Sequence, residues 1–75
     1  MDKPDLLAHL KFVDSATAAD VAHEFDVSEA TAGMALLRLL RQGLVQRSVH
    51  RDVYAYRLST RGRGRLRYLQ SFIRT

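Results

Sequence analysis

Apolar residues near the start of the chain recur with the spacing of an α-helix. Leu6, Leu7, Leu10 and Val13 follow the three-to-four-residue period that places side chains on one helical face. Pro4 comes before this series and suits the first turn of a helix, because the donor that proline lacks has no intrahelical acceptor there. The pattern predicts a first helix that ends after Val13, where the periodicity stops.

Two further helices are expected on either side of a short corner. Thr17 with Asp20 three residues later resembles a capping box at the start of one of them. Asp26 stands at the corner, where a positive φ is often required, and aspartate tolerates that backbone region better than most residues. Ser28 is a strong N-cap for a longer helix, and Gly43 suits its left-handed stop. The pattern therefore predicts a helix-turn-helix over residues 17–42.

A hairpin is expected after Gly43. Polar and apolar residues alternate over 45–49 and again over 53–58, with a turn at 50–52 between them. The alternation predicts a half-buried first strand. It also places Tyr54, Tyr56 and Leu58 on one face of the second strand. The two tyrosines are interpreted as packing residues rather than as platforms for stacking bases.

A last helix is expected over residues 60–73. Its apolar residues are Leu66, Leu69, Phe72 and Ile73, and Ser59 or Thr60 can cap it. Glycines at positions 62 and 64 weaken the first turn. We therefore expect this helix to start late.

Together these elements predict an α+β, mostly helical chain. Residues 1–75 are expected to form a single domain, because a chain of 75 residues has room for one core. The expected parts are a three-helix core with the helix-turn-helix at 17–42, a two-stranded wing at 44–58 and a C-terminal helix at 60–73. A hydrophobic content of 47% favours a folded chain over a disordered one.

Four segments of the chain carry a family resemblance. They are Thr17-x-x-Asp-Val-Ala, Val27-Ser-x-x-Thr31, Leu36-x-x-Leu39-x-x-x-Gly43-Leu-Val45 and Tyr56-x-Leu-Ser-x-x-Gly62. In this order and spacing they resemble the winged helix-turn-helix domain of small bacterial and archaeal transcription regulators of the MarR, PadR and ArsR kind.

The resemblance implies a mode of DNA binding. The helix at 29–42 would enter the major groove, and the wing would touch the flanking backbone or the minor groove. Contacts near the start of that helix would come from Ser28 and Thr31. Wing contacts would come from Arg47, His50 and Arg51. Members usually act as dimers on palindromic sites, so a homodimer is expected.

Charge divides the chain into an acidic and a basic half. Residues 1–35 hold two lysines and seven carboxylates, whereas residues 36–75 hold ten arginines and one aspartate, and the net charge is +4. Arginine suits bidentate contacts to phosphate and guanine. Arg61, Arg63, Arg65 and Arg67 alternate with other residues, and we interpret them as phosphate contacts. The alternative is a solvated start of the last helix.

The outward face of the helix at 29–42 is unusual for a DNA-reading helix. At about 100° per residue, Ala32, Ala35, Leu36 and Leu39 form the expected core stripe. A second apolar stripe lies roughly opposite, and Thr31, Arg38, Arg41 and Gln42 form a polar seam beside it. The second stripe consists of Ala30, Gly33, Met34, Leu37 and Leu40.

Three interpretations of the second stripe stay open. Leu37 and Leu40 can pack under the wing or the first helix. The stripe can instead be a surface for self-association or for a protein partner, because a helix that is apolar nearly all round is usually buried on two sides. Met34 or Ala30 can also contact thymine methyl groups in the major groove.

Several other functions lack support in the sequence. There is no cysteine, and His9, His23 and His50 are too scattered to predict a metal site. No set of residues combines a nucleophile, a base and a pocket, so no catalytic residue, enzyme activity or cofactor is expected. No apolar run approaches the roughly 20 residues of a membrane span, and no signal peptide is evident. A cytoplasmic location is expected.

The leading hypothesis is a transcriptional regulator, such as a repressor, that binds double-stranded DNA as a homodimer. The alternative is a winged-helix module that binds a protein through Met34, Leu37 and Leu40. Single-stranded nucleic acid or RNA is a weaker option. The candidate DNA contacts are Ser28, Thr31, Met34, Arg38, Arg47, His50, Arg51, Arg61, Arg63 and Arg65, and the candidate interface residues are Met34, Leu37, Leu40, Leu69 and Phe72.

Overall fold

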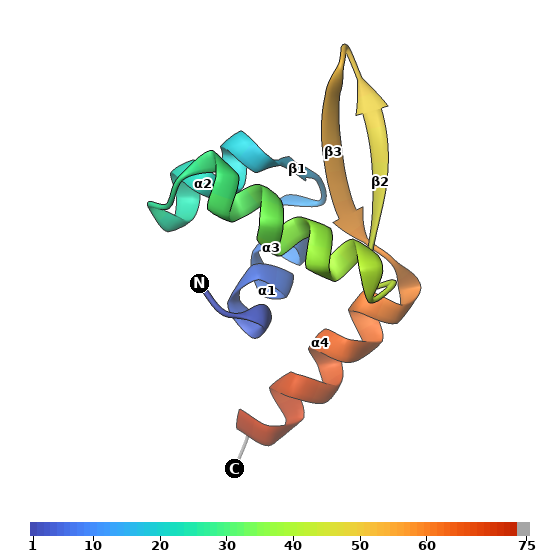
Figure 1. Cartoon of the computed structure of the whole chain (residues 1–75). Coiled ribbons are helices and arrows are strands. Elements are labelled where there is room, and N and C mark those ends of the chain that lie inside the picture. Colours follow the sequence, from blue (N-terminus) through green and yellow to red (C-terminus); the bar gives the residue numbers. More distant parts are fainter. Residues whose placement is uncertain (74–75) are drawn as a thin grey trace.

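A computed structural model describes residues 1–73, and the side chain of Ile73 lies outside the described part. The helices are α1 (Lys3–Val13), α2 (Ala18–Phe25), α3 (Glu29–Arg41) and α4 (Thr60–Ile73), and the strands are β1 (Ala16–Thr17), β2 (Val45–His50) and β3 (Val53–Leu58). Figure 1 shows α3 crossing the front of the molecule, with the β2–β3 hairpin above it and α4 below. The expected α+β, mostly helical class is confirmed.

Local capping fixes the starts of the first three helices. The Asp2 carboxylate accepts a hydrogen bond from the backbone N–H of Asp5 at 3.1 Å, which starts α1. Thr17 and Asp20 form the expected reciprocal capping box at the start of α2. The Ser28 hydroxyl accepts from the N–H of Thr31 at 3.0 Å at the start of α3. Each of these bonds satisfies a backbone donor that the first turn would otherwise leave free.

The corner between α2 and α3 has the predicted backbone. Asp26 lies in the left-handed region with φ 54° and ψ 51°. Val27 packs, partly buried, against the core. The chain therefore turns sharply enough for α3 to pack across α2.

The sheet has three antiparallel strands in the order β1-β3-β2. The sequence pattern predicts two strands and gives no sign of β1, which pairs Ala16 with Tyr56 and Thr17 with Ala55. A two-residue strand is too short to carry a period of its own. The β2–β3 pairing aligns Val45 with Leu58. This register joins the base of the hairpin to the core.

The expectation of a half-buried first strand in the hairpin is wrong beyond its first residue. Val45 is buried, whereas Val49 is 63% exposed. On β3, Tyr56 and Leu58 are buried but Tyr54 is 48% exposed. The hairpin projects away from the helices (Figure 1), so only its base can be covered.

One hydrophobic core joins all four helices and the base of the hairpin. Val13, the last apolar residue of the α1 series, lies outside it and is 38% exposed, because it ends the helix. The buried residues are Leu6, Leu7, Leu10, Ala16, Val21, Ala32, Leu36, Leu39, Leu44, Val45, Tyr56, Leu58 and Leu66.

The expected late start of α4 is also wrong, because the helix begins at Thr60. Ser59 caps it: its hydroxyl accepts from the N–H of Gly62 at 2.9 Å and donates to the carbonyl of Gly43 at 2.6 Å. The Ser59 N–H donates to the carbonyl oxygen of Leu44 at 3.0 Å. A Cβ on Gly62 would lie 1.8 Å from that same oxygen. Tertiary packing therefore requires glycine here and overrides its low helix propensity.

Candidate nucleic-acid interface

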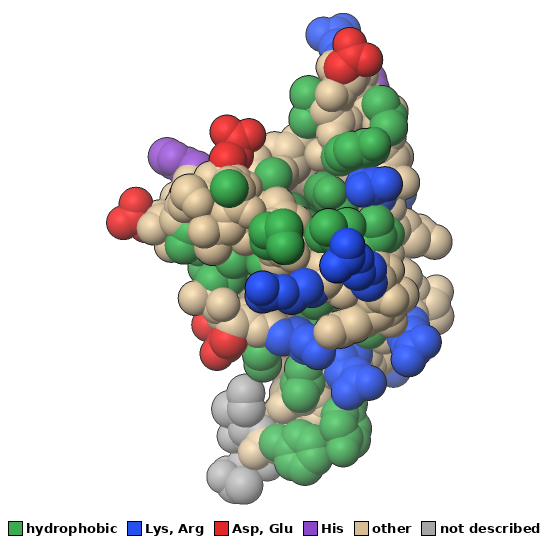
Figure 2. Space-filling view, viewed as in Figure 1, with side chains coloured by type: hydrophobic (Ala, Val, Ile, Leu, Met, Phe, Trp, Pro, Cys, Tyr) green, Lys and Arg blue, Asp and Glu red, His purple; other side chains and the backbone are tan. Residues whose placement is uncertain are grey.

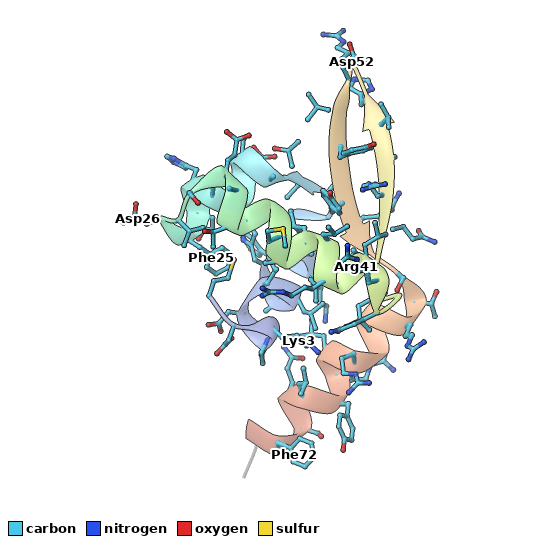
Figure 3. All side chains as sticks on the ribbon, in the orientation of Figure 1. Lys3, Phe25, Asp26, Arg41, Asp52 and Phe72 are labelled. Atoms are coloured by element: carbon cyan, nitrogen blue, oxygen red, sulfur yellow. The ribbon has the colours of Figure 1, made fainter. Side chains whose placement is uncertain are left out.

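The outward face of α3 lies opposite its buried stripe. Ala32, Leu36 and Leu39 are buried, as the helical period predicts. Met34 is 50% exposed on the other side. Arg41 lies seven residues beyond Met34 and so shares its face. In Figure 3 it lies on the last turn of α3.

The residues of the second apolar stripe of α3 differ in how far they are buried. Leu40 is half-buried and packs against the core. Gly33 is half-buried and faces α2. A Cβ added at Gly33 would lie 4.0 Å from the Cβ of Ala18 on α2. Leu37 is half-buried, whereas Ala30 and Met34 are exposed. The packing interpretation therefore fits Leu40, and the open surface centres on Ala30 and Met34.

The two hydroxyls at the start of α3 are tied to each other. Ser28 and Thr31 are both exposed. The Ser28 hydroxyl donates to Thr31 Oγ1 at 2.9 Å while it accepts from the Thr31 N–H at 3.0 Å. This arrangement leaves the Thr31 hydroxyl proton free to donate outward. Ser28 acts first as a helix cap, and only Thr31 retains a donor for a ligand.

The hairpin presents an arginine stacked on a tyrosine. The guanidinium carbon of Arg47, on β2, lies 4.0 Å from the centroid of the Tyr54 ring on β3. This cation–π contact limits the freedom of the long arginine side chain. His50 is exposed at the end of β2, and Arg51 is exposed in the turn. Arg51 and Asp52 have φ of 51° and 64° and form a two-residue turn with both positions left-handed.

The arginines of α4 do not form one row. A helix turns by about 100° per residue, so arginines two positions apart lie far apart around its axis. Arg61 and Arg65 share one flank of the buried Leu66, and Arg63 and Arg67 share the other flank. All four side chains are exposed. The predicted phosphate-binding run is thus two pairs on separate flanks.

The pair Arg61 and Arg65 extends a group of basic side chains at the C-terminal end of α3. The side chain of Arg61 lies beside Gly43, with its Cδ 3.7 Å from the Cβ that another residue would have there. Arg38 lines a shallow depression together with Lys3 at the start of α1. We define the basic belt as Lys3, Arg38, Arg41, Arg61 and Arg65.

The basic belt includes two residues, Lys3 and Arg41, that are not among the contacts predicted from the sequence. Lys3 is far from α3 in the sequence, and only the folded chain brings the start of α1 beside α3. Arg41 belongs to the polar seam, and its seven-residue spacing from Met34 is the sequence signal that places it on the outward face.

Figure 2 shows how charge is distributed over this face. Lysine and arginine side chains gather over the C-terminal half of α3 and the start of α4, with apolar side chains of α3 between them and the basic side chains of the hairpin. Acidic side chains lie toward the α2 edge, at the hairpin tip and near the start of α1. A second depression is lined by Glu29 and Asp52, with Thr17 and Tyr54. Basic side chains are therefore concentrated over the second half of α3 and the start of α4.

The arginines of this face are available to a ligand. Every arginine between Arg38 and Arg67 is exposed. Within residues 1–73, the side-chain hydrogen bonds join capping groups and backbone and use no arginine. Exposed guanidinium groups without internal partners can meet phosphates without first breaking an ion pair.

The remaining interface candidates lie on α4. Leu69 is half-buried and packs against the core. Phe72 is 65% exposed near the far end of the helix (Figure 3). Its ring meets that of Tyr68 edge to face, with the centroids 4.9 Å apart.

The described residues hold no cluster of three or more histidine, aspartate or glutamate side chains that could bind a metal ion. Across the same part of the chain, none of the helices has the length and apolar character of a membrane span.

Solved structures share this fold. The YusO protein from Bacillus subtilis matches with a TM-score of 0.88 and 21% identity, over 92% of this chain and 51% of that chain. Wild-type MarR from E. coli matches with a TM-score of 0.86 and 16% identity, over 95% of this chain and 54% of that chain. The transcriptional regulator BldR from Sulfolobus solfataricus matches with a TM-score of 0.83 and 17% identity, over 96% of this chain and 53% of that chain. Comparisons with protein-family models and with curated sequences find no match.

These similarities confirm the winged helix-turn-helix fold. They extend over nearly the whole of this chain, which spans about half the length of each of the three proteins. In this fold α3 is the second helix of the helix-turn-helix and β2–β3 is the wing.

Proposed function

We propose that the chain is a DNA-binding domain of a transcriptional regulator. In this proposal α3 enters the major groove, the wing contacts the flanking backbone through Arg47 and Arg51, and the basic belt contacts phosphates. The observation that carries it is the position of α3 in a helix-turn-helix between two groups of exposed basic side chains. Duplex DNA is the ligand that matches both features, because its phosphates run along both sides of the groove that a helix enters.

Affinity is expected to come mainly from phosphate contacts. Each neutralised phosphate releases counterions, so binding that depends on arginine weakens steeply with salt. Direct reading of bases is expected to contribute less, because no Arg, Lys, Asn or Gln lies between Ser28 and Leu37. The regulated genes and any effector are left open.

A homodimer forms part of the proposal. Of the five candidate interface residues, Leu40 and Leu69 already pack against the core, and Leu37 is half-buried. Phe72 is the most exposed of the five, and with Tyr68 it offers an aromatic surface on α4, away from α3. We place the dimer contact there, which leaves the outward face of α3 free for DNA. A cytoplasmic location and the absence of enzyme activity stay predictions.

The test is binding to a duplex of random sequence, followed by fluorescence anisotropy, with the native mass measured by sedimentation alongside. We expect binding that Arg41→Gln weakens and that Phe12→Ala, at an exposed apolar site on α1, leaves unchanged. Failure to bind any duplex at low salt, with a folded chain by circular dichroism, would contradict the proposed function.

A further inference from the structure

The exposed first half of α3 carries little hydrogen-bonding capacity. From Glu29 to Leu37 its polar side chains are Glu29 and Thr31. Glu29 faces the depression beside the wing, and Thr31 is engaged by the Ser28 hydroxyl. What this half presents outward instead is the Met34 side chain, 50% exposed, with the exposed methyl group of Ala30 one turn before it. Apart from the one hydroxyl donor of Thr31, any sequence preference of this surface therefore uses apolar contact.

The surroundings of this apolar surface decide which ligand it suits. Met34, Ala30, Thr31 and Arg38 line one shallow depression, so the apolar centre and the edge of the basic belt are continuous. On the wing side, Glu29 and Asp52 line a second depression, and the stacked Arg47 lies on β2 of the wing. An apolar centre that adjoins the basic belt complements a groove whose floor carries apolar groups and whose edges carry phosphates. An uncharged protein surface would leave the basic belt without counter-charge.

The major groove of DNA displays one apolar group, the C5-methyl of thymine. We infer that α3 reads thymine methyl groups through Met34, with Ala30 beside it, and that this contact is the principal source of its sequence preference. Methionine suits this role because its unbranched, polarizable side chain adapts to an irregular surface. The inference rests on the proposed function and adds the feature of DNA that α3 distinguishes.

Removal of the methyl group alone tests the inference. A short duplex of alternating A and T is compared with the same duplex in which uracil replaces every thymine, which deletes the C5-methyl and keeps the base pairing. Anisotropy titrations at one fixed salt concentration measure both affinities. We expect the thymine duplex to bind about fourfold more tightly for each methyl that Met34 covers, which corresponds to about 0.8 kcal/mol per buried group.

Variants assign the preference to its residue. Met34→Ala should bring the ratio of the two affinities close to one, because it shortens the side chain at an exposed helical site where alanine folds well. Met34→Leu should retain part of the preference, and Phe12→Ala should retain all of it. Equal binding of both duplexes by the wild type would overturn the inference and leave the proposed DNA binding intact.

The other outcomes are also decisive. A preference for thymine that persists in Met34→Ala would remove the assignment to Met34. Failure to bind either duplex would overturn the proposed function itself. Loss of native mass in folded Met34→Ala would show that a second protein chain covers this face instead, which also contradicts methyl reading.

Discussion

Gly62, at the start of α4, tests how α4 is held against α3. These two helices carry the four arginines of the basic belt. Gly62 lies against the backbone of Leu44, which follows α3. Its position sets where the first turns of α4, and therefore Arg61 and Arg65, lie relative to α3. We predict that Gly62→Ala destabilises the fold, whereas Gly64→Ala, two residues further along the same helix, stabilises it.

The magnitude follows from the distances. A Cβ at position 62 would lie 1.8 Å from the carbonyl oxygen of Leu44 and 2.9 Å from its carbonyl carbon. Relief of this clash requires a backbone shift of more than about 1.5 Å. Overpacking of this kind costs about 1–3 kcal/mol, and the shift also breaks the hydrogen bond from Ser59 to Leu44, worth about 1 kcal/mol. Alanine recovers about 1 kcal/mol of helix propensity, which leaves a net loss of roughly 1–3 kcal/mol.

Gly64 provides the matched control, because an added Cβ there has no neighbour within 4 Å. Gly64→Ala should therefore gain about 0.5–1 kcal/mol through helix propensity alone. Urea unfolding followed by circular dichroism measures both free energies of unfolding. A Gly62→Ala variant as stable as Gly64→Ala would refute the claim that close packing against Leu44 fixes the start of α4.

Three further experiments test other parts of the structure. Ser59→Ala removes the hydroxyl that bridges Gly43 and Gly62. Urea unfolding should show that the free energy of unfolding falls by about 1–2 kcal/mol. An unchanged free energy of unfolding would show that the bridge does not stabilise the fold. Glu29→Gln should bind duplex DNA more tightly in an anisotropy titration, because the Glu29 carboxylate repels phosphate. It should also lose about 0.3–1 kcal/mol of stability, because the carboxylate favours the helix start. Unchanged binding would place Glu29 away from DNA. If the chain is a dimer, Phe72→Arg should reduce the mass measured by sedimentation to that of a monomer, and Leu37→Arg should leave the mass unchanged. The reverse result would place the dimer contact on α3.

Local signals in the sequence predicted much of this fold. The capping box of Thr17 and Asp20, the cap at Ser28 and the corner at Asp26 each depend on residues within three positions of one another. Such short-range chemistry is readable without knowledge of the rest of the chain. The core stripe of α3 was predicted for the same reason, because one period fixes which side chains share a face.

Features that depend on distant contacts could not be predicted in this way. β1 exists because Ala16 meets Tyr56 across the sheet, and the start of α4 depends on Gly62 fitting against Leu44. The exposure of Val49 reflects how far the wing projects, which alternation does not encode. Lys3 joins the basic belt only through the packing of α1 beside α3. Each of these joins residues far apart in the sequence.

The central claim is that exposed arginines beside α3 hold duplex DNA by its phosphates. The most direct measurement is the salt dependence of binding to a random duplex, for the wild type, Arg65→Gln in the basic belt and Arg67→Gln on the opposite flank of α4. A plot of log affinity against log salt should fall with a slope steeper than about −3, and Arg65→Gln but not Arg67→Gln should make it shallower by about 0.9. A flat plot for the wild type, or equal slopes for all three proteins, would contradict the claim.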